Sequence, residues 1–154
     1  MKMKFKIIDK SNYWDCITLV IDESQEGFVA DNKQSLVEAA YEDGLYTLGI
    51  YHEETMVMVG FVLYDYDDTF PSWSMSRFMI GKQFQGKGYG KQAALAFLDY
   101  FKGKHNADKL YISVSLDNTV ARKMYSSIGF KEIKEVEYTF GGKCFREMQM
   151  VKEL

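Results

Sequence analysis

A glycine-rich turn is the part of the sequence whose residue types are best suited to bind a charged ligand. Gly86, Gly88 and Gly90 alternate there, and glycine permits positive φ and a close approach of a ligand to the backbone. The residues after the turn carry apolar side chains at helical spacing, namely Ala94, Phe97, Leu98 and Phe101. The first amides of a helix lack partners and lie at the positive end of its dipole, so the turn is expected to bind a phosphate or pyrophosphate.

Two common phosphate-binding loops do not match this turn. Residues 81–88 approach the P-loop pattern, but Gly88 stands where a Ser or Thr hydroxyl should contact magnesium. The three glycines read GxGxG, whereas the dinucleotide fingerprint requires GxGxxG directly after a strand. A third pattern, Q-x-x-G-x-G, is formed by Gln85, Gly88 and Gly90.

A second motif covers residues 116–130, with the sequence LDNTVARKMYSSIGF. Asp117 or Asn118 can cap a helix here, and Gly129 is placed for a left-handed C-terminal stop. The helix has one apolar side, formed by Val120, Ala121, Met124, Tyr125 and Ile128.

Hydrophobic periodicity predicts the remaining elements. A helix is expected after Asn12, a second from Gln34 to Tyr41 capped by Asp31 or Asn32, and a third from Tyr89. Strands are expected at 4–8, 46–51, 57–64, 73–80, 109–114, 130–138 and 143–151, with residues 65–68 as an exposed acidic tip and 141–142 as a hairpin turn. A right-handed crossover would make strand 109–114 parallel to strand 73–80.

Composition restricts the classes of function. The chain has 154 residues, 47% of them hydrophobic, and a formal net charge of −3, which argues against a nucleic-acid surface. Neither a signal peptide nor an apolar run long enough to cross a membrane is present in the sequence, so a cytoplasmic protein is expected. Cys16 and Cys144 are isolated and expected to be reduced, and His52 and His105 form no ligand cluster, so no metal is expected.

Both motifs resemble those of the GNAT superfamily of N-acetyltransferases. Gln85, Gly88 and Gly90 match its Q/R-x-x-G-x-G/A signature, and Asn118 and Tyr125, followed by a terminal Gly-Phe, are similar to its second acetyl-CoA motif. The resemblance implies an α/β (α+β) fold over residues 1–154 as a single acetyl-CoA-dependent N-acetyltransferase domain. That fold is a central mixed, mostly antiparallel sheet of about seven strands with about four helices, whose parallel strand pair opens around the acetyl-CoA site.

The same resemblance implies which residues bind the cosubstrate acetyl-CoA. Amides of Phe78, Met79 and Ile80 would bind the pantetheine arm, and Asn118 and Ala121 would lie beside it. The pyrophosphate would lie against the turn formed by Gln85, Gly86, Lys87, Gly88, Tyr89, Gly90 and Lys91.

Acetyl transfer to an amine needs a neutral amine, a group that polarises the thioester carbonyl, and a proton donor for the departing thiolate. Tyr125 suits the last role, because a phenol with a pKa of about 10 can donate to a thiolate whose conjugate acid has a pKa of about 8.5. Its alternative role is a core tyrosine on a helix face. A backbone amide near Met79 would polarise the carbonyl.

The general base is left open by the sequence. Many relatives place an acidic residue on the strand before the loop, but its polar positions here are Ser72, Ser74 and Ser76. A water relayed to Glu26 or Asp65 would serve, although either residue can equally be a solvated loop charge.

For the acceptor, residues 25–39 are similar to a segment of bacterial spermine/spermidine acetyltransferases. Glu26 and Asp65 would attract a polyamine, and Trp73 would cover its methylenes or an ammonium. The alternatives are a peptide or protein N-terminal or lysine amine as acceptor, or a non-catalytic acyl-CoA sensor. A small-molecule amine partner and a possible homodimer are expected, without nucleic acid or membrane.

Overall fold

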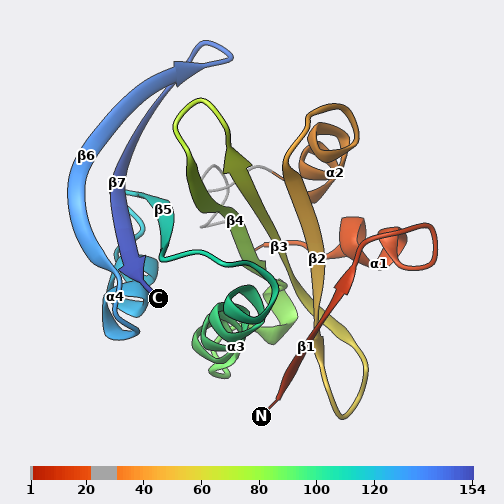
Figure 1. The fold of residues 1–154 in the computed structure, drawn as a ribbon. Helices are drawn as coiled ribbons and strands as arrows, with labels where there is room; N and C mark the ends of the chain where they lie inside the picture. The colour runs from red at the N-terminus through yellow and green to blue at the C-terminus, as the bar shows by residue number, and fades with distance from the viewer. Residues whose placement is uncertain (1, 22–30) are drawn as a thin grey trace.

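The computed structural model describes residues 2–21 and 31–154, which form a seven-stranded sheet in the order β1-β2-β3-β4-β5-β7-β6 (Figure 1). The strands are β1 (Met3–Ile7), β2 (Leu45–His52), β3 (Met58–Asp67), β4 (Ser72–Ile80), β5 (Lys109–Ser115), β6 (Lys131–Phe140) and β7 (Lys143–Glu153). Neighbouring strands are antiparallel except β4 and β5, which are parallel. The predicted mixed, mostly antiparallel sheet is therefore confirmed.

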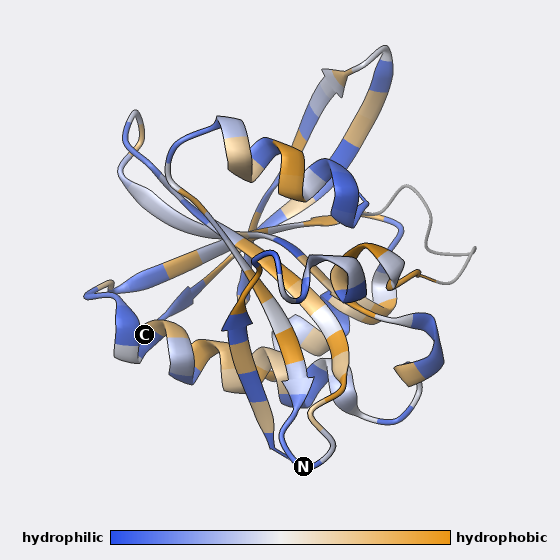
Figure 2. Ribbon diagram, turned by 90° about the vertical axis from the view of Figure 1, so that its right-hand side faces the viewer, coloured by the Kyte–Doolittle hydropathy of each residue, from blue (hydrophilic) through white to orange (hydrophobic). Residues whose placement is uncertain are grey.

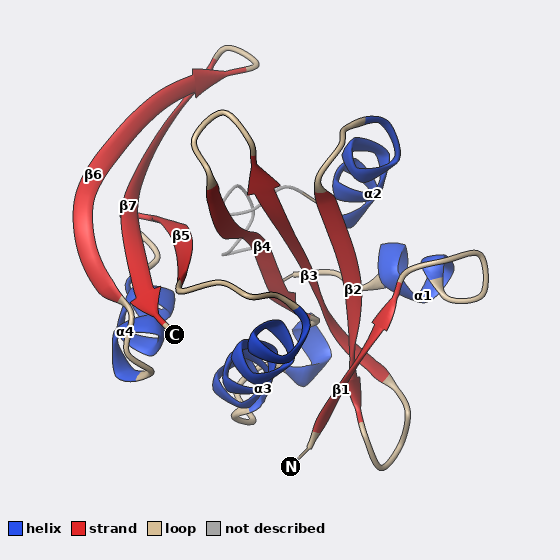
Figure 3. Ribbon diagram, in the orientation of Figure 1, coloured by secondary structure: helices blue, strands red, loops and turns tan. Residues whose placement is uncertain are grey.

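Helices cover both faces of this sheet (Figure 3). They are α1 (Tyr13–Thr18), α2 (Asn32–Tyr41), α3 (Tyr89–Lys104) and α4 (Thr119–Ser127), with a short 3-10 turn, η2 (Lys82–Phe84), before α3. The helices α1 and α2 lie on one face, and α3 and α4 lie on the other. Of the helices in the described parts of the chain, none is long and apolar enough to cross a membrane.

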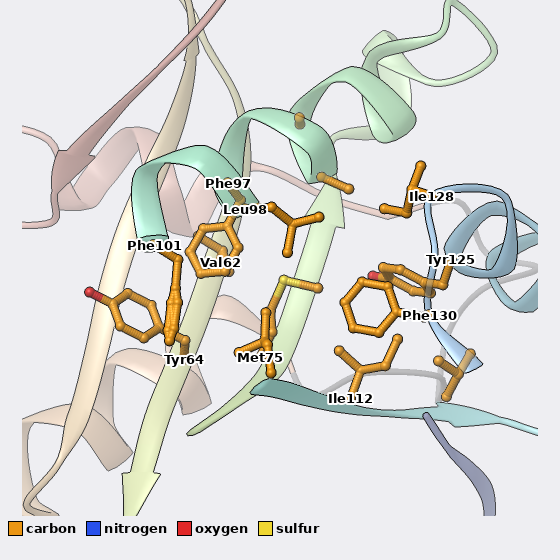
Figure 4. Close-up of a cluster of buried hydrophobic side chains, with 14 of the residues drawn as sticks. Val62, Tyr64, Met75, Phe97, Leu98, Phe101, Ile112, Tyr125, Ile128 and Phe130 are labelled. Carbon is orange, nitrogen blue, oxygen red and sulfur yellow. The ribbon is translucent and has the colours of Figure 1, made fainter. Parts of the chain in front are cut away.

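The larger hydrophobic core lies between the sheet and the pair α3 and α4 (Figure 4). Phe97 and Phe101 of α3 are fully buried and stack at 6.0 Å between ring centroids, as their helical spacing predicts. Each fully buried large side chain contributes about 1.5–3 kcal/mol to stability. Figure 2 shows the hydrophobic residues concentrated along the central strands, which both helical layers cover.

The second core lies beneath α1 and α2 and fixes the start of α2. Asp31 caps α2, because its carboxylate accepts a hydrogen bond from the backbone N–H of Gln34 at 2.7 Å. Asn32, the other predicted cap, is buried and donates to the carbonyl of Cys16 at 2.9 Å. This bond ties α2 to α1.

The structure also decides or confirms several local predictions. Asn118 caps α4, since its Oδ1 accepts the N–H of Ala121 at 3.2 Å. Gly129 ends this helix region with φ of +103°. Gly141 and Gly142 have φ of +60° and +77°, which suits the two-residue turn of the β6–β7 hairpin.

The acidic tip predicted at residues 65–68 is wrong in part. β3 continues to Asp67, and the half-buried Asp65 accepts a hydrogen bond from the hydroxyl of Ser76. The pairing with β4 extends beyond the apolar residues that defined the strand in the sequence. The exposed turn therefore retains only Asp67 and Asp68 of the predicted acidic residues.

Gly60 of β3 should be intolerant of a side chain. A Cβ there would lie 2.4 Å from the carbonyl oxygen of Met79 and 2.9 Å from Cδ1 of Ile80. We expect Gly60→Ala to lower the free energy of unfolding by about 1–3 kcal/mol, as overpacking does. Chemical denaturation measures the change.

The matched control is Gly103→Ala in the last turn of α3, where a Cβ would meet no heavy atom within 4 Å. It should raise stability by about 0.4–1 kcal/mol, because alanine restricts the unfolded chain. A Gly60→Ala variant as stable as the parent would contradict the close packing of β3 against β4.

Candidate functional site

Two cavities adjoin at β4. The first, which we call the loop cavity, has a volume of about 360 Å³ and lies between the end of β4, the glycine turn and α4. The second, the α2-side cavity, has a volume of about 930 Å³ and is bordered by α1, α2 and strands β4 to β7. Ile21 and Met79 line both cavities. A reactive group at this junction would be reached from two sides.

The glycine turn of the loop cavity has the geometry of an anion site. Gly86 and Gly88 have φ of +74° and +82°, and a Cβ on either would meet no heavy atom within 4 Å. Gly88 is the N-cap of α3 and gives it no side-chain cap. Gln85 donates from Nε2 to the carbonyl of Ile80 at 2.8 Å, which fixes the turn against β4. The unfilled space and the first amides of α3 fit a pyrophosphate group.

The backbone of β4 presents polar groups to this site. The N–H of Gly81 donates to the carbonyl of Val59 on β3 at 2.8 Å. Because successive residues of a strand point to opposite edges, Met79 also faces β3, and we infer that Phe78 and Ile80 direct their N–H groups away from it. A carbonyl-polarising amide is expected near Met79, and by this alternation the N–H groups free of β3 there are those of Phe78 and Ile80.

β4 and β5 separate next to these amides. In the described residues their parallel pairing is confined to Ser74 and Tyr111, early in each strand. The later part of β4 is therefore an open strand edge, which can pair with an extended ligand. β5 itself is held on its other side by β7 over its whole length.

One face of α4 completes the loop cavity. Its side chains there are Val120, Ala121, Met124 and Tyr125, with Asn118 at the cap. Val120 is 79% exposed at the cavity, whereas Ala121, Met124 and Tyr125 also pack against the core. The sequence analysis identified Val120 and Met124 only as part of an apolar helix side, although they share that side with two predicted site residues.

Tyr125 combines a packed ring with a place at the cavity wall. Only 6% of the residue is exposed, and its ring meets that of Phe130 edge-on, with 5.5 Å between ring centroids (Figure 4). The ring centroid of Phe78 lies 6.4 Å away. Burial raises the pKa of the phenol well above its usual value. Tyr125 is therefore neutral at physiological pH and can donate a proton.

The predicted cofactor residues come together with one exception. Lys87 lies in the same turn but is exposed and outside the cavity lining. The others line the loop cavity: Phe78, Met79, Ile80, Gln85, Gly86, Gly88, Tyr89, Gly90, Lys91, Asn118, Ala121 and Tyr125.

In the α2-side cavity, an ion pair joins α2 to β4. Arg77 donates from Nη1 to Oε2 of Glu38 and, at 3.2 Å, to the hydroxyl of Ser35. Hydrogen bonding by the guanidinium lowers the pKa of Glu38. The charge of Glu38 is thus neutralised by the protein itself.

Glu147 is a cavity carboxylate that the sequence analysis did not identify. It lies on β7, diagonally across the β6–β7 ladder from Tyr138, which pairs with Phe145. Burial raises the pKa of Glu147, and burial followed by the charge of Glu147 raises the pKa of Tyr138 to about 12. Side-chain alternation along β7 could have placed Glu147 on the cavity face, because every second residue of this strand lines the cavity: Lys143, Phe145, Glu147 and Gln149.

The predicted acceptor residues are not brought together. Glu26 lies outside the described residues, as does part of segment 25–39, and neither Asp65 nor Trp73 lines either of the two cavities. Trp73 packs on the α3 face, 4.2 Å from the ring of His105 between centroids. The strand β4 has a bulge at Ser76, which reverses the side-chain alternation. Trp73 therefore lies on the opposite face of the sheet from Arg77 and Met79, which line the α2-side cavity. In the described parts of the chain, no group of three His, Cys, Asp or Glu side chains could hold a metal ion.

Comparison with known proteins agrees with this geometry. The model of the acetyltransferase (GNAT) family matches residues 12–130. Two relatives from Bacillus subtilis align over the full length of both chains, a probable spermine N(1)-acetyltransferase of the natto strain at 28% identity and a spermine/spermidine N(1)-acetyltransferase at 27%.

Solved structures are similar in fold. Spermidine N-acetyltransferase from Vibrio cholerae, in complex with CoA and spermine, superimposes with a TM-score of 0.77 at 15% identity, covering 98% of this chain and 95% of that one. The ribosomal-protein-S18-alanine N-acetyltransferase from Escherichia coli gives 0.72 at 13% identity, with coverage of 99% and 94%. These likenesses confirm the predicted fold.

Substitution of Gly88 tests the loop cavity as the acetyl-CoA site. Gly88→Val places a branched side chain in open space where the pyrophosphate would bind, and forces a positive φ on it. Affinity for acetyl-CoA should fall about tenfold or more, as measured by calorimetry.

Gly141→Val is the matched control, since Gly141 also has a positive φ and open space but lies at the hairpin turn. It should incur a similar strain of about 1–2 kcal/mol and leave acetyl-CoA affinity unchanged. Equal affinities in the two variants would show that the turn does not bind the cosubstrate.

Proposed function

The chain belongs to the acetyltransferase (GNAT) family, and from this premise we propose that its acetyl acceptor is a primary amine of a linear polyamine. It is an acetyl-CoA-dependent N-acetyltransferase. The observation that carries the proposal is the junction of two cavities at Met79, one with open space at a glycine turn that fits a pyrophosphate and the other lined by carboxylates and aromatic rings. The full-length relatives named as spermine acetyltransferases support the same acceptor.

The loop cavity is proposed to bind acetyl-CoA, which supplies a thioester carbonyl for the amine to attack. The first amides of α3 and the turn at Gly86 and Gly88 would hold the pyrophosphate. Amides of Phe78 and Ile80, at the open edge of β4, would hold the pantetheine arm and polarise the carbonyl.

Tyr125 is proposed to donate a proton to the departing thiolate. Its pKa is raised by burial, which at first sight makes it a weaker acid. However, a thiolate in the same low-dielectric cavity is destabilised by the same desolvation, so the two pKa values move in one direction. The raised pKa also keeps the resting phenol protonated at physiological pH, so its proton is available for donation.

The α2-side cavity is proposed to bind the polyamine. Its wall contains the aromatic residues Tyr111, Tyr138, Phe140 and Phe145, on which methylenes can pack and ammonium groups can bind by cation–π contact. Asp65 would add negative charge through Ser76, which lines the cavity, and Glu26 remains a proposed contributor. Trp73, on the opposite face, is not part of this proposal.

A peptide amine is the second candidate acceptor. Ser74, Ser76 and Arg77 line the α2-side cavity and can hydrogen-bond to a peptide backbone. The two acceptors differ in charge, because a polyamine carries several ammonium groups and a peptide amine carries one.

Replacing Tyr125 with Phe keeps the ring packing and removes the donor. We expect kcat to fall about 10²- to 10⁴-fold, the usual contribution of general acid catalysis, while acetyl-CoA affinity stays within twofold. Steady-state kinetics and calorimetry separate the two effects.

Tyr51→Phe is the control, because Tyr51 is also 6% exposed but lies outside both cavities and bonds to Asn12 at 3.2 Å. It should cost about 1 kcal/mol of stability and leave kcat unchanged. A Tyr125→Phe enzyme with parental kcat would assign Tyr125 to the core alone.

An amine panel tests the acceptor. Release of free thiol should give a higher kcat/KM for spermine and spermidine than for a lysine peptide or an aminoglycoside. Raising ionic strength from about 0.01 to 0.15 M shortens the Debye length from about 30 to 8 Å and should raise KM for spermine more than for a monoamine.

A lysine peptide preferred tenfold or more would replace the polyamine with the second candidate. Binding of acetyl-CoA without turnover of any amine would identify a non-catalytic acyl-CoA sensor.

A further inference from the structure

Three described carboxylates line the α2-side cavity: Asp31, Glu38 and Glu147. Two of them already have structural partners. Asp31 accepts the N–H of Gln34 as the cap of α2, and Glu38 is paired with Arg77. Glu147 has neither a capping role nor an ion pair, since no cationic side chain in the described ranges lies within ion-pair distance of it. Its neighbour on β6 is the neutral Tyr138, which pairs with Phe145, two residues before Glu147.

Glu147 is fixed by strands on both sides. β7 lies between β5 and β6, and Glu147 pairs with Ser115 on one and Val136 on the other. It is half-buried, and desolvation is the main influence on its carboxylate. A partly desolvated carboxylate without a cation is costly, and a bound cation would offset that cost.

The wall beside Glu147 is suited to an organic cation. Tyr138 and Phe145 stack with ring centroids 5.2 Å apart and an interplanar angle of 16°. The chain's own ammonium, Nζ of Lys143, lies 5.4 Å from the centroid of Phe145. The aromatic wall therefore already binds one ammonium group by cation–π contact.

We propose that Glu147 binds an ammonium group of the acceptor other than the one that is acetylated, with Tyr138 as its positioning residue. This assignment rests on the proposed function. Glu147 lines only the α2-side cavity, whereas the junction with the loop cavity is formed by Ile21 and Met79. An ionised carboxylate also stabilises the protonated amine, which suits a distal nitrogen and opposes attack by the reacting one.

The assignment makes Glu147 a specificity determinant for acceptors with two or more positive charges. A diamine would place one nitrogen at the junction and the other at Glu147. A monoamine of equal length would leave Glu147 without its cation. Diaminohexane and hexylamine are such a pair.

Glu147→Gln tests this role, since it keeps the shape of the side chain and removes its charge. KM for spermine and for diaminohexane should rise about 10- to 100-fold, the range for losing a hydrogen bond to a charged group. KM for hexylamine and kcat for all three amines should stay within about twofold of the parent.

Glu135→Gln is the matched control. Glu135 carries the same charge on the same hairpin, but it pairs with Met148 and therefore lies on the other face, outside the cavity. Its ion-pair partner is Arg146, at 3.9 Å, and both side chains are exposed. Loss of such a surface ion pair should change stability and amine binding little. All of its KM values should match the parent.

Thermal unfolding gives a readout besides activity. The folded pKa of Glu147 is raised, so this group favours the folded state at low pH and that contribution is lost as pH rises through the folded pKa. At pH 7 Glu147→Gln should therefore have a higher Tm than the parent without ligand. Spermine should raise the Tm of the CoA-loaded parent and of Glu135→Gln, but not that of Glu147→Gln.

Tyr138→Phe separates the positioning of Glu147 by Tyr138 from the binding of the ammonium group by Glu147. It retains the ring and the carboxylate, so KM for diaminohexane should rise only a few-fold, with hexylamine unchanged. It also serves if Glu147→Gln does not fold.

Two results would overturn the assignment. Equal KM changes for diaminohexane and hexylamine would place Glu147 at the reacting nitrogen, and parental KM values in Glu147→Gln would remove it from the site. Failure of the proposed function is distinct, because the parent enzyme itself would then acetylate no polyamine.

Discussion

The separation of β4 from β5 is the constraint on which the rest of the structure depends. Both strands begin as a parallel pair at Ser74 and Tyr111 and then diverge. A parallel pair needs a crossover connection, here the glycine turn and α3, so the turn necessarily lies at the end of β4 where the open edge begins. The amides of the strand edge and of the helix start are thus brought to one cavity by chain connectivity.

Opposite layers of helices make the two cavities chemically different. On the α3 and α4 side, the large aromatic core fixes the ring of Tyr125 and leaves its pKa raised by burial (Figure 4). On the α1 and α2 side, the core is smaller, and the cavity wall retains charged groups such as Arg77 and Glu147. The charged groups of the α2-side cavity and the proposed proton donor Tyr125 therefore lie on different sides of the sheet.

The charged groups of the α2-side cavity are mostly satisfied internally. The Arg77–Glu38 pair, with Ser35, attaches α2 to β4 and so holds one wall of the cavity in place. A half-buried ion pair adds little net stability, because desolvation offsets much of the Coulomb attraction. Its more important effect is to neutralise Glu38, so that the proposed binding of an external cation falls to Glu147.

The sequence by itself determined the features that depend on local chain geometry. The alternate glycines, the helical period of α3 and the cap and stop of α4 act within a few residues, and together they located the glycine turn and Tyr125 and identified the family. The mixed sheet with its parallel pair followed from the same element order. Only Lys87 of the predicted cofactor residues lies outside the loop cavity lining.

Only the tertiary structure decided the acceptor side. Strict alternation along β4 would place Trp73 on the same face as Arg77 and Met79, but the bulge at Ser76 moves Trp73 to the opposite one. Glu147 lies far from β4 in the sequence and reaches the cavity only through the pairing of β7 with β5. Strand register and bulges arise from long-range hydrogen bonding, which residue type and spacing do not specify.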